Sequence, residues 1–152
     1  MKSLFCVSRW NLKSNIYCSM KIEAFLLCDA ATDAMGKLNV LGAFDRIFLK
    51  QVPGVYQGAT VAMRVRFDRS EVGTHHFEIR FIDQDGRDII KALNGQVDVN
   101  FGSDAHSGAM NFILHIVRVQ FAYFGEYQLD LRFNNEIRAS LPLTVHPVPK
   151  DR

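Results

Sequence analysis

Strict alternation of apolar and polar residues along short segments is the feature of this 152-residue sequence that most restricts its fold. It is clearest between residues 61 and 68, where every second side chain is apolar and most of the intervening ones are charged. The same period of two recurs at 76–81, 127–133 and 137–145. A strand places successive side chains on opposite faces, whereas a helix repeats every 3.6 residues. The pattern therefore predicts strands that bury one face and expose the other.

Turn-forming residues separate the later segments. Asn134-Asn135 joins the last two, and Asp85-Gly86 is a strong signal for a two-residue hairpin. We expect the strand that returns from Asp85-Gly86 to cover residues 88–93. Asn94-Gly95 then predicts a further turn or a bulge before a strand at 97–101.

The first strands are expected to begin just after Met20. We predict one strand at 22–28 and a second at 38–49, joined by a connection at 29–36. The last residue of this connection, Gly36, can adopt the positive φ that a tight turn requires. Residues 111–123 are too continuously apolar to show one buried face, so we interpret them as a central strand.

Strands that follow one another without intervening helices are typical of sandwiches and barrels. We predict an all-β fold, a two-sheet antiparallel β-sandwich of about eight strands. An immunoglobulin-like version is favoured by Tyr127, which stands near the start of a late strand as in a tyrosine corner. The cysteine and tryptophan hallmarks of antibody domains are missing, because the single tryptophan, Trp10, precedes the first strand.

The length suits a single domain. We expect an atypical N-terminal extension at 1–19, one domain at 20–147 and a tail at 148–152. Lys2 precedes a short apolar run, but polar residues interrupt it before it reaches the 7 to 15 residues of a signal peptide. We therefore interpret Met20 as the natural start of the protein.

Charge and cysteine content restrict the partners and the compartment. Of the 18 basic residues, three lie in the first 19 positions, which leaves 15 against 16 acidic residues. This balance argues against a nucleic-acid partner, which requires a basic surface. The three cysteines, Cys6, Cys18 and Cys28, have no regular spacing and predict a reducing, cytoplasmic environment. The sequence lacks the roughly 18 to 20 consecutive apolar residues of a membrane span, so we expect no membrane partner.

The opening of the folded part carries a family resemblance. It combines the segment Phe25–Ala31 with Gly-Lys-Leu-Asn-Val-Leu-Gly-Ala-Phe-Asp-Arg-Ile at 36–47. With His76, Asp83–Gly86 and Gly125-Glu126-Tyr127, it resembles a family of uncharacterised bacterial proteins over residues 21–147. The segment 102–108 departs from the Pro-Gly-rich loop expected there. The resemblance implies one bacterial domain and supplies no catalytic residues.

Candidate sites for chemistry are few. Asp83, Asp85 and Asp88 offer closely spaced carboxylates for calcium, but the distal glutamate of an EF-hand loop is missing. His75 and His76 are adjacent, so they point to opposite faces of a strand and cannot readily share a metal. Serine and cysteine residues lack the motif of a nucleophile elbow. We therefore predict no catalytic residues, no metal and no cofactor.

The strongest hint of an interaction is the apolar excess in 111–123, because one strand cannot direct all of these side chains into one core. Either the remainder of the chain or a partner must cover the second face. Ile113, Val117 and Val119 are the candidate interface residues. Arginines on the polar strand faces stand among acidic residues, so we expect cross-strand ion pairs there rather than an anion site.

The sequence does not determine a function. The best hypothesis is a non-enzymatic β-sandwich module that binds a protein partner or forms a homo-oligomer. The alternative is a small-ligand-binding or hydrolytic domain that uses the polar loops 83–88 and 102–108. Convergence of His75 or His76, His106 and Asp83 in one pocket would favour that alternative.

Overall fold

The computed structural model describes residues 20–150, which form nine strands and one turn of 3₁₀ helix, η1 (Arg69–Glu71). The strands are β1 (Lys21–Ala34), β2 (Lys37–Ala43), β3 (Arg46–Leu49), β4 (Gly54–Asp68), β5 (Gly73–Asp83), β6 (Leu93–Val99), β7 (Ser107–Phe121), β8 (Gly125–Phe133) and β9 (Glu136–Pro147). The predicted extension at 1–19 lies outside the described residues.

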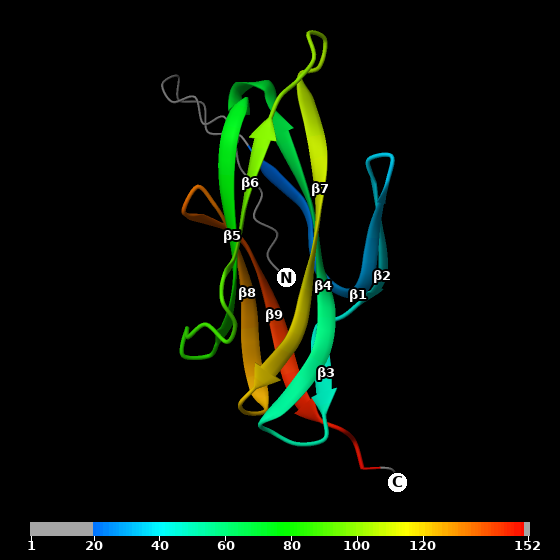
Figure 1. Ribbon diagram of the computed structural model, residues 1–152, viewed down its shortest axis with the longest axis vertical. Coiled ribbons are helices and arrows are strands. Elements are labelled where there is room, and N and C mark those ends of the chain that lie inside the picture. The colour runs from blue at the N-terminus through cyan, green and yellow to red at the C-terminus, as the bar shows by residue number, and fades with distance from the viewer. Residues whose placement is uncertain (1–19, 151–152) are drawn as a thin grey trace, which may run out of the picture.

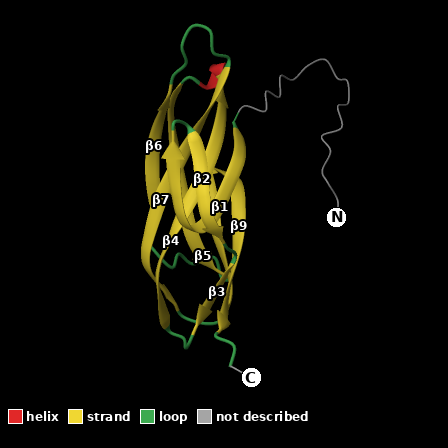
Figure 2. Ribbon diagram, turned by 90° about the vertical axis from the view of Figure 1, so that its right-hand side faces the viewer, coloured by secondary structure: helices red, strands yellow, loops and turns green. Residues whose placement is uncertain are grey.

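The strands form two sheets that pack face to face (Figure 1). Sheet A has the order β2-β1-β4-β7, and sheet B has the order β3-β9-β8-β5-β6. All neighbouring strands are antiparallel except β3 and β9, which are parallel. Seen from the side, the sandwich is long and narrow, with its strands near the long axis (Figure 2). The predicted all-β, two-sheet sandwich is confirmed.

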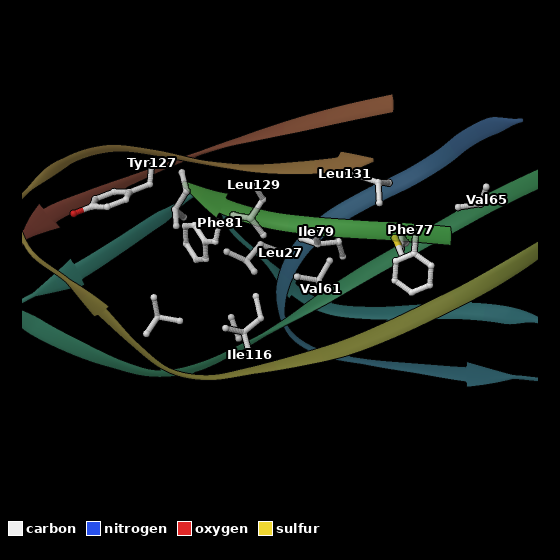
Figure 3. Close-up of a cluster of buried hydrophobic side chains, with 14 of the residues drawn as sticks. Leu27, Val61, Val65, Phe77, Ile79, Phe81, Ile116, Tyr127, Leu129 and Leu131 are labelled. Carbon is white, nitrogen blue, oxygen red and sulfur yellow. The ribbon is translucent and has the colours of Figure 1, made fainter. Parts of the chain in front are cut away.

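The alternating side chains fill the space between the sheets. From β4, every odd residue from Val61 to Phe67 is fully buried in the core. Phe77, Ile79 and Phe81 of β5 meet them from sheet B (Figure 3). Burying one such side chain stabilises the fold by roughly 1.5–3 kcal/mol, so the period of two specifies which face of each strand is inside.

The last hairpin forms as the sequence predicts. Asn134 and Asn135 join β8 to β9, and both have positive φ, at 48° and 69°. Two successive left-handed residues define the turn that matches the twist of antiparallel strands, and asparagine tolerates this conformation better than most residues.

The predicted hydrogen bond of the tyrosine corner is also present. The Tyr127 hydroxyl donates to the Tyr123 carbonyl at 2.9 Å and lies 3.3 Å from the Tyr123 amide nitrogen. Burial raises the pKa of Tyr127. The wider immunoglobulin-like assignment stays a prediction.

The prediction for the first strands is wrong in two places. Residues 29–34, expected in a connection, continue β1 and pair with β2. The expected single strand at 38–49 is two strands in different sheets, because β3 leaves sheet A and pairs with β9. Cys28 is where β1 changes partner, since it pairs with both Ala43 of β2 and Thr60 of β4.

The prediction after Asp85-Gly86 is also partly wrong. The turn is present, but the expected return strand is reduced to a single bridge between Ile82 and Asp88. Asn94-Gly95 is no turn, because both residues belong to β6. Gly95 stands opposite Phe77, and a β-carbon on it would lie 2.2 Å from the Phe77 ring. Glycine is present because the ring occupies the space of its side chain.

Candidate functional site

β7 is an edge strand, not the central strand that its apolar sequence predicts. It spans 15 residues, pairs with β4 on one side and ends sheet A on the other. Its sequence contains no acidic residue and no proline, and Arg118 is its single Lys or Arg residue. Proteins usually protect exposed edges with charges, prolines or short strands. The backbone along this edge is therefore available to pair with another strand.

A local irregularity of the backbone explains why β7 is apolar without being central. Arg118 has a φ of 54°, outside the extended region, although the register between β4 and β7 is the same on both sides of it. The buried residues on either side, Ile116 and Val119, are consequently three positions apart instead of two. The local irregularity delivers two apolar side chains to the core and leaves Val117 and Arg118 outside it.

The three candidate interface residues have different surroundings. Val119 is 2% exposed and belongs to the core, so it is not accessible to a partner. Ile113 is half-buried on the outer face of sheet A. Val117 is 71% exposed on that same face. Among the three, Val117 is therefore the side chain that a partner can reach.

A hairpin of this chain covers part of the outer face of sheet A. β1 bends after Cys28, and residues 29–43 fold back as a hairpin that stands beside β4 and β7 (Figures 1 and 2). We call this segment the outer hairpin. Beneath it, Ala62 has no exposed surface although it alternates with the core residues Val61 and Met63. The second apolar face predicted for this region is thus covered partly from within the molecule.

Polar side chains attach the tip of the outer hairpin to the sheet. The Asn111 side-chain amide donates to Asp33 at 2.7 Å, and Arg64 donates to the Gly36 carbonyl at 2.9 Å. Arg64 also donates to the Asn111 oxygen at 2.8 Å and to Glu23 at 2.9 Å. The Asn111 and Gly36 hydrogen bonds hold the pKa of Asp33 below its usual value.

Sequence reasoning missed this arrangement. Asp33 was expected in a loop, and Asn111 lies 78 positions further along the chain. The only signal in the sequence was the surplus of apolar residues around Ile113, which indicated a covered face but not what covers it. Long-range contacts of this kind are decided by the path of the chain.

The expected cross-strand ion pairs are confirmed. Arg64 and Arg66 both bind Glu23, and Arg132 lies 3.7 Å from Glu78. On sheet B, Arg80 binds both carboxylate oxygens of Asp88 at 2.9 and 3.0 Å, which raises the Arg80 pKa and lowers that of Asp88. Solvent screens exposed pairs of this kind, so they contribute little to the stability of the fold.

The candidate calcium residues have structural partners. Asp83 accepts hydrogen bonds from the amides of Asp85 and Arg87, both at 2.9 Å, and so closes its turn. Asp88 is engaged by Arg80. Between residues 20 and 150 there is no group of three His, Cys, Asp or Glu side chains placed to hold one metal ion.

The two polar loops do not form one pocket. His75 and His76 stand near the start of β5, whereas Asp83 is its last residue. His106 lies near η1, where its carbonyl accepts from the Arg69 amide. Loop 102–108 is at one end of the sandwich, and loop 83–88 lies toward the other (Figure 1).

Sheet B has shallow depressions on its outer face. One of about 410 Å³ lies where the end of β5 meets β8 and β9. Its lining residues are Ile82, Asp83, Gln84, Gly86, Glu126, Tyr127, Gln128, Pro142, Leu143 and Thr144. A second of about 440 Å³ lies near the opposite end of β5, beside His76 and Arg132. The histidines and Asp83 therefore border different depressions.

The fold and the site define a class: a two-sheet β-sandwich in which one sheet ends in a long edge strand, β7. The model of a family of unknown function (DUF6941) matches residues 23–146, and the chain belongs to that family. The predicted family resemblance is confirmed. In the described part of the chain, no helix is long and apolar enough to cross a membrane.

Other comparisons add little. No curated protein matches the chain. Among solved structures, it is similar to one titled "putative beta-galactosidase from bacteroides fragilis", with 13% identity and a TM-score of 0.39. The match covers 62% of this chain and 16% of that chain. A likeness this low supports no statement about fold or function.

Proposed function

We propose that this chain is a non-enzymatic, cytoplasmic protein-interaction domain of bacterial origin, and that it binds through the β7 edge of sheet A and the outer face beside that edge. The observation that carries the proposal is the free 15-residue strand. An edge strand offers a row of backbone donors and acceptors to an incoming strand, and side chains beside it supply selectivity.

The side chains beside the edge support this assignment. Val117 exposes an apolar side chain on the outer face, and the neighbouring Gly58 of β4 leaves that side chain uncovered from within the sheet. The nearby outer hairpin bounds the surface on the other side (Figure 2). A partner strand would thus meet free backbone and one apolar contact together.

The alternative function, a ligand-binding or hydrolytic domain built on the polar loops, has less support. Its strongest form needs His75 or His76, His106 and Asp83 in one place, but the two adjacent histidines and Asp83 lie toward opposite ends of β5. A ligand would then have to bind in a single depression on sheet B, which contains either His76 or Asp83 but not both.

The first test is the solution mass of the full chain by light scattering over a wide concentration range. Growth to a dimer supports an interaction domain that recognises itself. A monomer at every concentration contradicts self-association. In that case, failure of the purified chain to bind any of a panel of β-strand peptides would contradict the proposal as a whole.

A further inference from the structure

We infer that the partner of β7 is β7 of a second copy, paired antiparallel about a two-fold axis, so that two copies of sheet A become one continuous sheet. This inference rests on the proposed function and specifies its partner. Closed two-fold pairing is the commonest way in which identical chains associate. It requires a strand that is complementary to itself.

The regular part of the edge defines how two copies can meet. The positive φ of Arg118 interrupts the regular extended backbone of β7, so the uninterrupted segment is Ser107–Val117. Full-length antiparallel pairing of this segment with itself is centred on Phe112. Ser107 then lies opposite Val117 of the other copy, and Gly108 lies opposite Ile116. Opposite residues share a face, which keeps the outer and core faces of both copies aligned.

The sizes of the side chains favour this orientation. The first three residues of the segment are small, being Ser107, Gly108 and Ala109, whereas its last three are His115, Ile116 and Val117. Antiparallel pairing places the small half of each copy beside the large half of the other. Parallel pairing would place large residues against large ones and leave the small half without contacts.

Electrostatics does not oppose the association. The segment Ser107–Val117 contains no Asp, Glu, Lys or Arg, so no like charges face one another along the paired strands. From residue 20 onward the chain has 15 basic and 16 acidic residues, so two copies repel one another only weakly. Charges that normally prevent edge pairing are thus missing from the edge itself.

Paired cysteines test the inference directly. The variant carries Ser107→Cys and Val117→Cys in a chain whose Cys6 and Cys18 are replaced by serine. In one copy, ten residues of extended strand hold the two cysteines about 33 Å apart, too far for an internal disulfide. In the antiparallel dimer they lie opposite one another between copies, within the 4.4–6.8 Å that disulfides span. We expect rapid oxidation to a covalent dimer, and much slower oxidation of each single-cysteine variant.

A charge variant provides a second, independent measurement. Val117→Lys places a charge beside the paired strands, and we expect the dissociation constant of the dimer to rise at least tenfold. Ile137→Lys is the matched control, because Ile137 is 56% exposed on a strand of sheet B. It should leave the dimer unchanged. Far-ultraviolet circular dichroism of both variants checks that each folds.

The outcomes separate the two proposals. Cross-linking of the double-cysteine variant together with the effect of Val117→Lys supports the β7 pair. A dimer that neither cross-links nor responds to Val117→Lys overturns this inference but leaves self-association through another surface. If the chain is a monomer at every concentration, the inference is overturned and only a different partner strand remains for the proposed function.

Discussion

Replacing Tyr127 with phenylalanine removes a hydroxyl that serves two backbone groups of Tyr123. The ring is buried, with its centre 4.9 Å from that of Phe121, and phenylalanine fills the same space. The substitution therefore isolates the hydrogen bonds from the packing. It leaves the Tyr123 carbonyl without its 2.9 Å donor and removes the hydroxyl acceptor 3.3 Å from the Tyr123 amide.

The expected loss of stability follows from these contacts. A single hydrogen bond contributes about 0.5–1.5 kcal/mol net, and leaving a buried polar partner unsatisfied costs about 1–3 kcal/mol. Tyr123 is half-buried, so water can reach part of its backbone and reduce the penalty. We expect Tyr127→Phe to lower the free energy of unfolding by about 1–3 kcal/mol.

Urea denaturation followed by circular dichroism measures this change through the midpoint, provided that the slope stays constant. Tyr123→Phe is the matched control, because the Tyr123 hydroxyl makes one long 3.3 Å contact, to the amide of Gln84. Its loss should cost less than about 0.5 kcal/mol. If the two variants are equally stable, the reasoning about the tyrosine corner is refuted.

Three further predictions concern separate parts of the fold. Gly95→Ala drives a methyl group into the Phe77 ring and should cost about 1–3 kcal/mol in urea denaturation; unchanged stability would show that the ring moves freely. The pKa of Asp33 is lowered in the folded state, so its carboxylate stabilises the folded hairpin at pH values above its ordinary pKa of 3.8, and this stabilisation is lost as the pH falls through the lowered pKa. Hydrogen exchange should then show the outer hairpin loosening in acid before the core, and Asp33→Asn should abolish that acid step. Arg69→Ala removes a guanidinium that donates to the carbonyls of residues 102, 103 and 105. Limited proteolysis should therefore cut this loop faster in the variant, while the midpoint of urea unfolding hardly changes. Equal cleavage rates would contradict a role of Arg69 in ordering the loop.

Local patterns predict much of this fold because strands have a local signature. The alternation at 61–68 correctly assigns the core face of β4, and Asn134-Asn135 correctly marks a hairpin whose turn requires positive φ. Asn94-Gly95 misleads for a local reason too. The same dipeptide that suits a turn also suits a strand when an opposite ring, here that of Phe77, fills the glycine's place.

The candidate site was less predictable, because it depends on which strand has no neighbour. The composition of 111–123 drew attention to Ile113, Val117 and Val119, but the positive φ at Arg118 lies between the exposed Val117 and the buried Val119. Sequence alone could not place that change in the backbone, since arginine has no special preference for positive φ.

By itself, the sequence determined the two-sheet sandwich, the inward face of its regular strands, the ion-paired polar faces and the family. Those properties follow from the period of two and from turn chemistry, which act over a few residues. Only the tertiary structure decided that β7 ends its sheet and that residues 29–43 fold back over sheet A. Strand order and the contact between Asp33 and Asn111 join distant parts of the chain, and their energies depend on how the whole chain closes its core.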